Sequence, residues 1–188
     1  MLTRRLIPCL NVRLGKVVKP ARSMAIDDPT DPVACARHFQ AQGADEIALL
    51  DLSASSDGLA AAVETVKAVR QALSIPIIVG GGIRTWEDAA RLLESGADKI
   101  ATNTAAVKNP NLLTQLAVRF GTQCTVVSID AAQRGPDDWE VVTRSGTDRT
   151  GIDVIEWAKE AMNSGAGELL LTSWDRDGTG TGYDLELL

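Results

Sequence analysis

Short apolar runs of strand length alternate along this chain with amphipathic stretches of about 10 to 15 residues. Apolar runs typical of strands lie at residues 6–10, 46–51, 76–79, 99–102, 124–129 and 168–172. Helical patterns lie between them, at 31–42, 59–73 and 152–163, with further helices beginning near 85 and 109. Alternation of this kind is typical of repeated βα units, so the pattern predicts an α/β fold with parallel strands.

Helix boundaries are marked by local signals. Asp31 is suited to the N-cap of the first helix, with Pro32 at its first position and Gly43 just past its end. Thr85 is expected to cap the third helix, with Asp88 three residues later in the place of the usual Glu. The dipeptide Asn109-Pro110 is expected to cap the fourth.

Residues 133–150 depart from this rhythm. The run 139–144 and the Ser145-Gly146 turn predict a small hairpin inserted after the fifth strand. Residues 183–188 are expected to begin another helix. Because strands recur at regular spacing and no Pro/Ser-rich linker interrupts them, residues 1–188 are expected to form one domain.

Composition narrows the choice of partners. The 188 residues are 45% hydrophobic and carry a formal net charge of −6, which argues against a nucleic-acid or anionic-membrane surface. No apolar run has the length of a transmembrane helix or of a signal-peptide core, so a cytoplasmic protein is expected. Three widely spaced cysteines and a single histidine, His38 in the first helix, predict no metal site, no other cofactor and no His-based triad.

Polar residues and glycines follow each predicted strand. In parallel βα folds these positions meet at one edge of the sheet, where catalytic and binding groups gather. A single polar residue after a strand is an ordinary loop residue or cap, but a succession of six favours a site. The positions are Asn11, Asp51, Gly80-Gly81-Gly82, Asn103-Thr104, Asp130, and Asp175 with Asp177.

The three glycines predict a phosphate site. Gly81 and Gly82 let backbone N–H groups approach an anion before a helix N-terminus, and Asn103 and Thr104 could donate to the same phosphate. The alternative is a flexible turn. Asp51 lies on the same predicted edge and is a further candidate for substrate contact.

Asp130 is the candidate general acid/base. It follows the apolar run 126–129, where a partly desolvated carboxylate would have a raised pKa. The alternative is a carboxylate that pairs with a lysine such as Lys19. The segment 175–179, with Asp177 and Thr179, could bind ribose hydroxyls or a second phosphate, although such Asp/Gly clusters are also common in turns.

Taken together, these motifs resemble the cyclase subunit of imidazole glycerol phosphate synthase, in order and over essentially the whole chain. The segments that carry the resemblance are Arg5-Leu6-Ile7-Pro8-Cys9-Leu10, Asp51-Leu52-Ser53-Ala54-Ser55, Val79-Gly80-Gly81-Gly82-Ile83-Arg84, Asn103-Thr104-Ala105-Ala106-Val107, Ile129-Asp130 and Asp175-Arg176-Asp177-Gly178-Thr179.

The resemblance implies a (βα)8 barrel of the TIM type and a reaction of histidine biosynthesis. Ammonia from a glutaminase partner reacts with a bis-phosphorylated ribulosyl aminoimidazole carboxamide, which gives imidazole glycerol phosphate and an aminoimidazole carboxamide ribotide. It also implies roles for individual residues. Asp130 would be one of two catalytic aspartates, Gly82, Asn103 and Thr104 would surround a substrate phosphate, Lys19 would be a mobile-loop lysine, and Arg5, Glu46, Asp98, Lys99 and Glu168 would form the glutaminase-facing ammonia gate.

Two departures from the family pattern bear on activity. The second catalytic aspartate of the family is Asn11 here, and an amide does not exchange protons near neutral pH as a carboxyl group does. A complete barrel needs about 250 residues, whereas this chain ends just past the sixth predicted strand. The expected fold is therefore an incomplete barrel of about six βα units, either as such or as a fragment of a longer gene product.

Three hypotheses remain open. The chain is a cyclase with weak or lost turnover, a non-catalytic phosphate-binding module, or an enzyme acting on another sugar phosphate. Because an incomplete barrel leaves strand edges unpaired, a homo-oligomer is expected as well.

Overall fold

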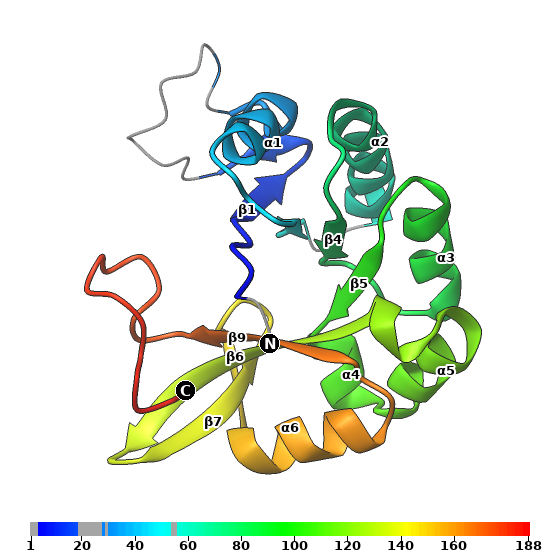
Figure 1. The fold of residues 1–188 in the computed structure, drawn as a ribbon. Coiled ribbons are helices and arrows are strands. Elements are labelled where there is room, and N and C mark those ends of the chain that lie inside the picture. The colour runs from blue at the N-terminus through cyan, green and yellow to red at the C-terminus, as the bar shows by residue number, and fades with distance from the viewer. Residues whose placement is uncertain (1–3, 19–27, 29, 54–55) are drawn as a thin grey trace. The chain divides into compact units, whose positions relative to one another are not determined.

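The structure is a computed structural model, and it describes residues 4–18, 28, 30–53 and 56–188 (Figure 1). Two compact units divide the chain, Met1–Ile100 and Ala101–Leu188, and each is described by itself. Within the described ranges, no helix combines the length and the apolar character that a membrane span requires.

The first unit is a parallel sheet with one short antiparallel strand. Its strands are β1 (Cys9–Arg13), β2 (Lys16–Val17), β3 (Ile47–Asp51) and β4 (Ile77–Gly80), and its helices are α1 (Pro32–Ala41), α2 (Ser56–Ala72) and α3 (Trp86–Glu94). Strand β3 pairs in parallel with β1 on one side and with β4 on the other. Strand β5 (Lys99–Thr102) crosses the boundary between the units.

The predicted caps of the first unit are confirmed. The Asp31 side chain accepts hydrogen bonds from the backbone N–H groups of Val33 and Ala34 at the start of α1. Thr85 and Asp88 form a reciprocal capping box at the start of α3. These side chains satisfy N–H groups that have no partner within the helix.

The first strand begins later than the sequence pattern indicates. It was expected at 6–10, but β1 begins at Cys9 and continues through Asn11, which therefore lies inside the strand. Pro8 has no N–H and only its carbonyl accepts, from the Ala48 backbone at 2.9 Å. The unexpected strand β2 follows a two-residue turn in which Leu14 and Gly15 both have positive φ, a hairpin turn that leucine rarely adopts.

The second unit is built around the long strand β6. Its strands are β6 (Thr125–Gly135), β7 (Asp138–Thr143), β8 (Asp148–Asp153) and β9 (Glu168–Ser173), and its helices are α4 (Thr104–Lys108), α5 (Asn111–Phe120) and α6 (Val154–Asn163), with a 3₁₀ turn at Thr122–Cys124. Strand β6 pairs in parallel with β9 and antiparallel with β7, and β7 pairs antiparallel with β8.

The predicted hairpin is confirmed, and it is larger than expected. The outer half of β6 belongs to it, so β6, β7 and β8 form a three-stranded antiparallel extension. Helix α4 was not predicted, and α5 begins after Pro110 with no side-chain cap. Residues 183–188 form a single turn, with the Leu188 N–H donating to the Asp184 carbonyl at 3.3 Å, rather than a helix.

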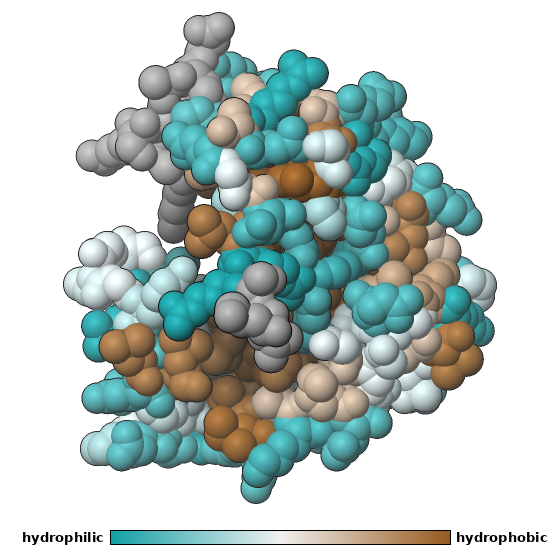
Figure 2. All heavy atoms as spheres, viewed as in Figure 1, coloured by the Kyte–Doolittle hydropathy of each residue, from teal (hydrophilic) through white to brown (hydrophobic). Residues whose placement is uncertain are grey.

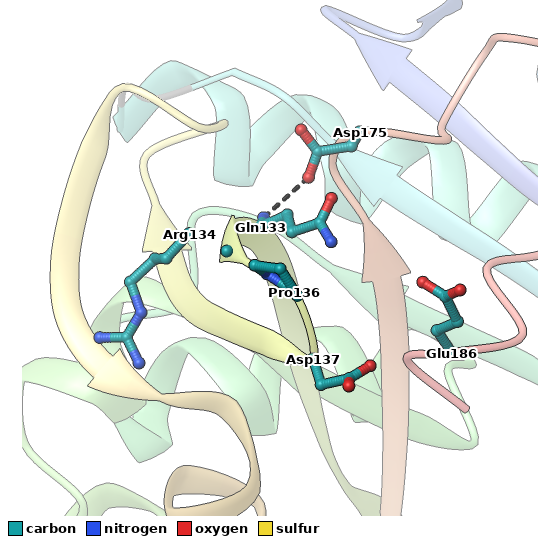
Figure 3. A pocket seen from close by; sticks show the side chains of 7 residues that line it. Gln133, Arg134, Pro136, Asp137, Asp175 and Glu186 are labelled. Carbon is teal, nitrogen blue, oxygen red and sulfur yellow. Dashed lines mark hydrogen bonds between the residues drawn. The ribbon is translucent and has the colours of Figure 1, made fainter.

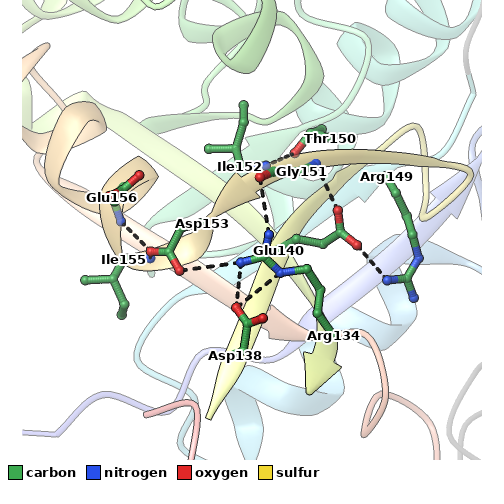
Figure 4. A network of polar contacts seen from close by, with 10 residues as sticks. All are labelled: Arg134, Asp138, Glu140, Arg149, Thr150, Gly151, Ile152, Asp153, Ile155 and Glu156. Atoms are coloured by element: carbon green, nitrogen blue, oxygen red, sulfur yellow. Dashed lines mark hydrogen bonds and ion pairs between the residues drawn. The ribbon is translucent and has the colours of Figure 1, made fainter. Parts of the chain in front are cut away.

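Apolar packing and one buried carboxylate hold this extension in place. Trp157 of α6 is 1% exposed in a cluster that includes Val127 and Ile129 of β6. Glu140 of β7 is buried, and it accepts from Arg149 at 2.6 Å and from the Gly151 N–H at 2.9 Å (Figure 4). These contacts, with the Arg149 hydrogen bond as the largest cause, lower the pKa of Glu140, so the carboxylate stays charged and joins β7 to β8.

We predict that Gly81→Ala destabilises the first unit strongly. Gly81 has φ +102°, and a Cβ there would overlap the backbone carbonyl of Asp51. Strain and overlap together should lower the free energy of unfolding by about 2–5 kcal/mol in urea titrations followed by circular dichroism. Gly43→Ala is the control, since Gly43 has φ +91° but no atom within 4 Å of its Cβ position. Equal losses in the two variants would contradict the overlap with Asp51.

Candidate active site

Asp130 lies inside β6, at the point where the strand changes partners. Its backbone is opposite Thr172 of the parallel strand β9 and opposite Val142 of the antiparallel strand β7. The sequence pattern placed Asp130 just past the end of a strand, because the hairpin continuation of β6 was not recognised. Strand pairing with β9 and with β7 therefore fixes the position of the Asp130 Cα.

Asn103 and Thr172 hydrogen-bond the Asp130 carboxyl group. Asn103 Nδ2 donates to Asp130 Oδ2 at 3.0 Å, from the position directly after β5. Burial, and to a smaller extent the charge of Asp177, raise the pKa of Asp130 to about 6, against the opposing hydrogen bonds from Asn103 and Thr172. A carboxyl group with this pKa exists in both protonation states near neutral pH, as general acid/base catalysis requires.

Thr104 connects the same loop to the β7–β8 hairpin. Its Oγ1 accepts a hydrogen bond from the backbone N–H of Arg144 at 3.2 Å. Neither Asn103 nor Thr104 is used as a helix cap, because α4 begins without a side-chain cap bond. Asn103 Oδ1 is buried and has no partner, which leaves it able to accept from a ligand.

The loop after β9 holds the predicted acidic cluster. Asp175 Oδ2 accepts from the Gln133 backbone N–H at 2.8 Å, and Thr179 Oγ1 donates to the Arg176 carbonyl at 2.8 Å. Figure 3 shows Asp175 on the rim of an open cavity of about 670 Å³, which is lined by Gln133, Arg134, Gly135, Pro136, Asp137, Asp175 and Glu186. Asp130 does not line this cavity, so the cavity and the candidate catalytic group are separate features.

In the first unit, candidate residues from three strands lie in one region. The register places Asn11 of β1 beside Leu50 of β3, and Leu50 beside Gly80 of β4. The glycines that follow, Gly81 and Gly82, both have positive φ, and Gly82 is exposed. The register therefore sets Asn11 and Gly80 in one row of this sheet, and their role in a site stays a prediction. Lys19 lies outside the described residues.

Only one carboxylate oxygen of Asp51 has a hydrogen-bond partner. Its Oδ1 accepts from the Ser53 N–H at 2.6 Å, and its Oδ2 is buried without a hydrogen-bond partner. The carbonyl of the same residue closely faces Gly81. Asp51 therefore stabilises the turn after β3 and keeps one acceptor atom unused.

A charged group lies at the opposite ends of the same strands. Glu46 is 5% exposed and forms ion pairs with Arg5 and with Lys99 Nζ, the latter at 3.1 Å. Asp98, expected in the same group, instead binds Arg70 at 3.1 Å and accepts from the Ile77 N–H at 2.8 Å. Glu168 begins β9 in the second unit.

Thr172 is the site residue that the sequence analysis missed. Its side chain hydrogen-bonds Asp130, but the sequence showed it only as the last residue of an apolar strand. Its position opposite Asp130 depends on the β6–β9 register, for which the chain carries no local signal.

No metal centre accompanies this site in the residues that the structure covers. No three His, Cys, Asp or Glu side chains among them could hold an ion together, and Cys9, Cys35 and Cys124 form no disulfide.

The raised pKa of Asp130 predicts a pH-dependent cost in stability. Between pH 3.8, the ordinary aspartate pKa, and a pH of about 6, the native state holds this proton while the unfolded chain loses it. The free energy of unfolding therefore falls as the pH rises through that interval. A rise in pKa of this size corresponds to about 3 kcal/mol. Asp130→Asn removes the effect, so its stability relative to the unchanged chain should increase between pH 4 and 7, measured by urea unfolding; a pH-independent difference would contradict the shift.

Comparison with known proteins agrees with this geometry. The family described as histidine biosynthesis protein matches residues 5–188. Imidazole glycerol phosphate synthase subunit HisF of Exiguobacterium sibiricum is 50% identical over 188 residues, which are 100% of this chain and 75% of the relative. These matches confirm the resemblance found in the motifs, and the partly parallel α/β architecture agrees with a partial barrel of this family. The chain belongs to the histidine biosynthesis protein family.

Proposed function

We propose that this chain carries the cyclase activity of imidazole glycerol phosphate synthase, with Asp130 as its general acid/base. The supporting observation is the buried Asp130 carboxyl group, which is oriented by Asn103 and has a pKa of about 6. The 50% identity to the HisF subunit supplies the reaction. In that reaction ammonia converts a bis-phosphorylated ribulosyl aminoimidazole carboxamide to imidazole glycerol phosphate and an aminoimidazole carboxamide ribotide.

Proton transfer is the step that Asp130 is suited to perform. Ammonia loses protons as it forms bonds to carbon, and the departing oxygen and nitrogen atoms gain protons. An ionised Asp130 accepts a proton from nitrogen, and the protonated form returns it to a leaving group. Asn103, as a neutral donor at 3.0 Å, holds the carboxyl group in place without pairing it with a positive charge.

Substrate phosphate is assigned in this proposal to the loop after β4. Gly82 is exposed and has positive φ, and backbone N–H groups of a glycine loop before a helix are suited to an anion. Asn103 and Thr104 are separate candidates for contact with a substrate phosphate, and Lys19, Asp51, Asp177 and Thr179 stay candidates for contact with the substrate.

Asn11 limits the activity in this proposal. Asn11 of β1 is paired with Leu50 of β3, which is paired with Gly80 of β4. An Asp in place of Asn11 would add a second group capable of proton transfer. Loss of one such group costs about 10²–10⁴-fold in rate. The same residue is the observation that favours the second candidate, a phosphate-binding module that retains the fold and performs no chemistry.

Ammonia supply is the proposed role of the charged group at the far strand ends. The ion pairs of Glu46 with Arg5 and Lys99 close the amino-terminal end of the first sheet and offer charged contacts to a glutaminase subunit. Asp98 and Glu168 belong to the same proposed interface. A cytoplasmic location accompanies this biosynthetic role.

A second copy of this chain is a further proposed partner. Among the described residues, β9 pairs with β6 alone, and Leu169 on β9 is 41% exposed. An unpaired strand edge with exposed apolar side chains favours pairing with another strand.

The activity prediction compares three proteins in one ammonia-dependent assay. Asn11→Asp should raise the rate of imidazole glycerol phosphate formation by roughly 10²–10⁴-fold, because it restores a second proton-transfer group. Adding Asp130→Asn to that variant should lower the rate of product formation by a similar factor. Absence of product from the unchanged chain and from Asn11→Asp would reject the cyclase and leave the phosphate-binding module.

Self-association has its own test. Light scattering should give a mass of at least two chains for the unchanged protein and a lower mass for Leu169→Lys, because lysine disfavours edge pairing. Val118→Lys is the matched control, since Val118 is 78% exposed and belongs to helix α5 rather than to a strand. A monodisperse monomer before any substitution would reject the proposal.

A further inference from the structure

Trp174 is an exposed aromatic residue two positions past Thr172. It directly follows β9, and its backbone N–H donates to the Ala131 carbonyl at 2.8 Å, so the ladder beside Asp130 continues to this residue. Side chains two apart on a strand point to the same face, so Trp174 follows Thr172, which hydrogen-bonds Asp130. The Trp174 residue nonetheless remains 44% exposed.

The indole ring rests flat on the backbone of Gly146. A Cβ added at Gly146 would overlap three ring atoms of Trp174, Cζ2 and its bonded neighbours Cη2 and Cε2, at nearly equal distances. An approach along the ring edge would bring one atom well ahead of its neighbours, so Gly146 meets the ring face. Glycine is required here both by this contact and by its φ of +80°.

Gly146 belongs to a turn that contacts Thr104, in the segment directly after β5. It lies in the turn between β7 and β8, and Arg144 of the same turn donates its backbone N–H to Thr104 Oγ1. Thr104 follows Asn103, which donates to Asp130. A chain of contacts therefore links Asp130 to the indole, from Asn103 and Thr104 through the β7–β8 turn to Gly146 and Trp174.

We propose that the exposed part of the Trp174 ring is a stacking surface for the planar heteroaromatic ring of the substrate. One ring face is covered by Gly146, so the exposed area belongs to the opposite face and the edge. A side chain supported from behind loses little conformational freedom when a ligand stacks on it. The aminoimidazole carboxamide group is planar and aromatic; its identity as the ligand rests on the proposed cyclase function.

The arrangement explains why an apolar ring stays at the surface. Trp139 and Trp157 are at most 9% exposed and belong to the apolar core of the second unit. Trp174 contributes to neither the described core nor a helix, and its backbone bonds to Ala131, the residue after Asp130.

The test measures binding of two probes by calorimetry: aminoimidazole carboxamide ribotide, and ribose 5-phosphate, which lacks the aromatic ring. Trp174→Leu should weaken ribotide binding roughly tenfold or more and change ribose 5-phosphate binding less than twofold, since stacking on a base-like ring contributes on this scale. Trp174→Phe keeps a flat ring and should retain ribotide binding within about threefold. Circular dichroism of each variant verifies folding.

A second pair of variants tests the support of the ring. Gly146→Ala should displace the indole and weaken ribotide binding as Trp174→Leu does. Gly151→Ala is the control, because Gly151 has a similar φ of +71° and no atom within 4 Å of its Cβ position.

Equal loss of both probes in Trp174→Leu, unchanged ribotide binding, or no preference of the unchanged chain for the ribotide would each overturn the stacking surface. Failure of the cyclase assay with ring-dependent binding intact would reject the proposed reaction and leave the stacking surface standing.

Discussion

The second unit depends on the double pairing of β6. One half of this strand continues the parallel sheet with β9, and the other half forms the first arm of an antiparallel extension with β7. Asp130 lies where the two patterns meet, so neither neighbouring strand can shift without moving it. This constraint places a carboxyl group among apolar strands, and the resulting burial is the main cause of its raised pKa. The chemistry of the site therefore follows from the strand arrangement.

Most of the fold could be predicted from the chain because its signals are local. Caps at Asp31 and Thr85 and the apolar runs of the strands depend on neighbours within a few residues. The errors arose where pairing with distant segments decides the outcome. Strand β1 begins at Cys9, because Pro8 before it has no N–H to donate to β3. Strand β6 extends because β7 pairs with its second half. In the candidate site, Asp130 and Asn103 followed from their positions after apolar runs, whereas Thr172 required the β6–β9 register.

The family match concerns the chain as a whole, whereas the activity depends on individual residues. The match over residues 5–188 identifies the family, and the retained Asp130 and Asn103 form a hydrogen-bonded pair. Asn11 stands where the resemblance implies a second catalytic aspartate, and its strand pairs regularly with β3. The β7–β8 turn contacts Thr104 through Arg144 and Trp174 through Gly146, so in the proposed site the hairpin contacts both the loop after β5 and the residue after β9.

The central claim is that burial makes Asp130 a proton-transfer group near neutral pH. The most direct measurement is a pH titration of the Asp130 carboxyl carbon by ¹³C NMR, with the resonance assigned by its loss in Asp130→Asn. Burial predicts a midpoint of about 6 for this carboxyl group. A midpoint near the ordinary aspartate value of 3.8 would show that Asp130 is solvated and ionised, and would contradict the account.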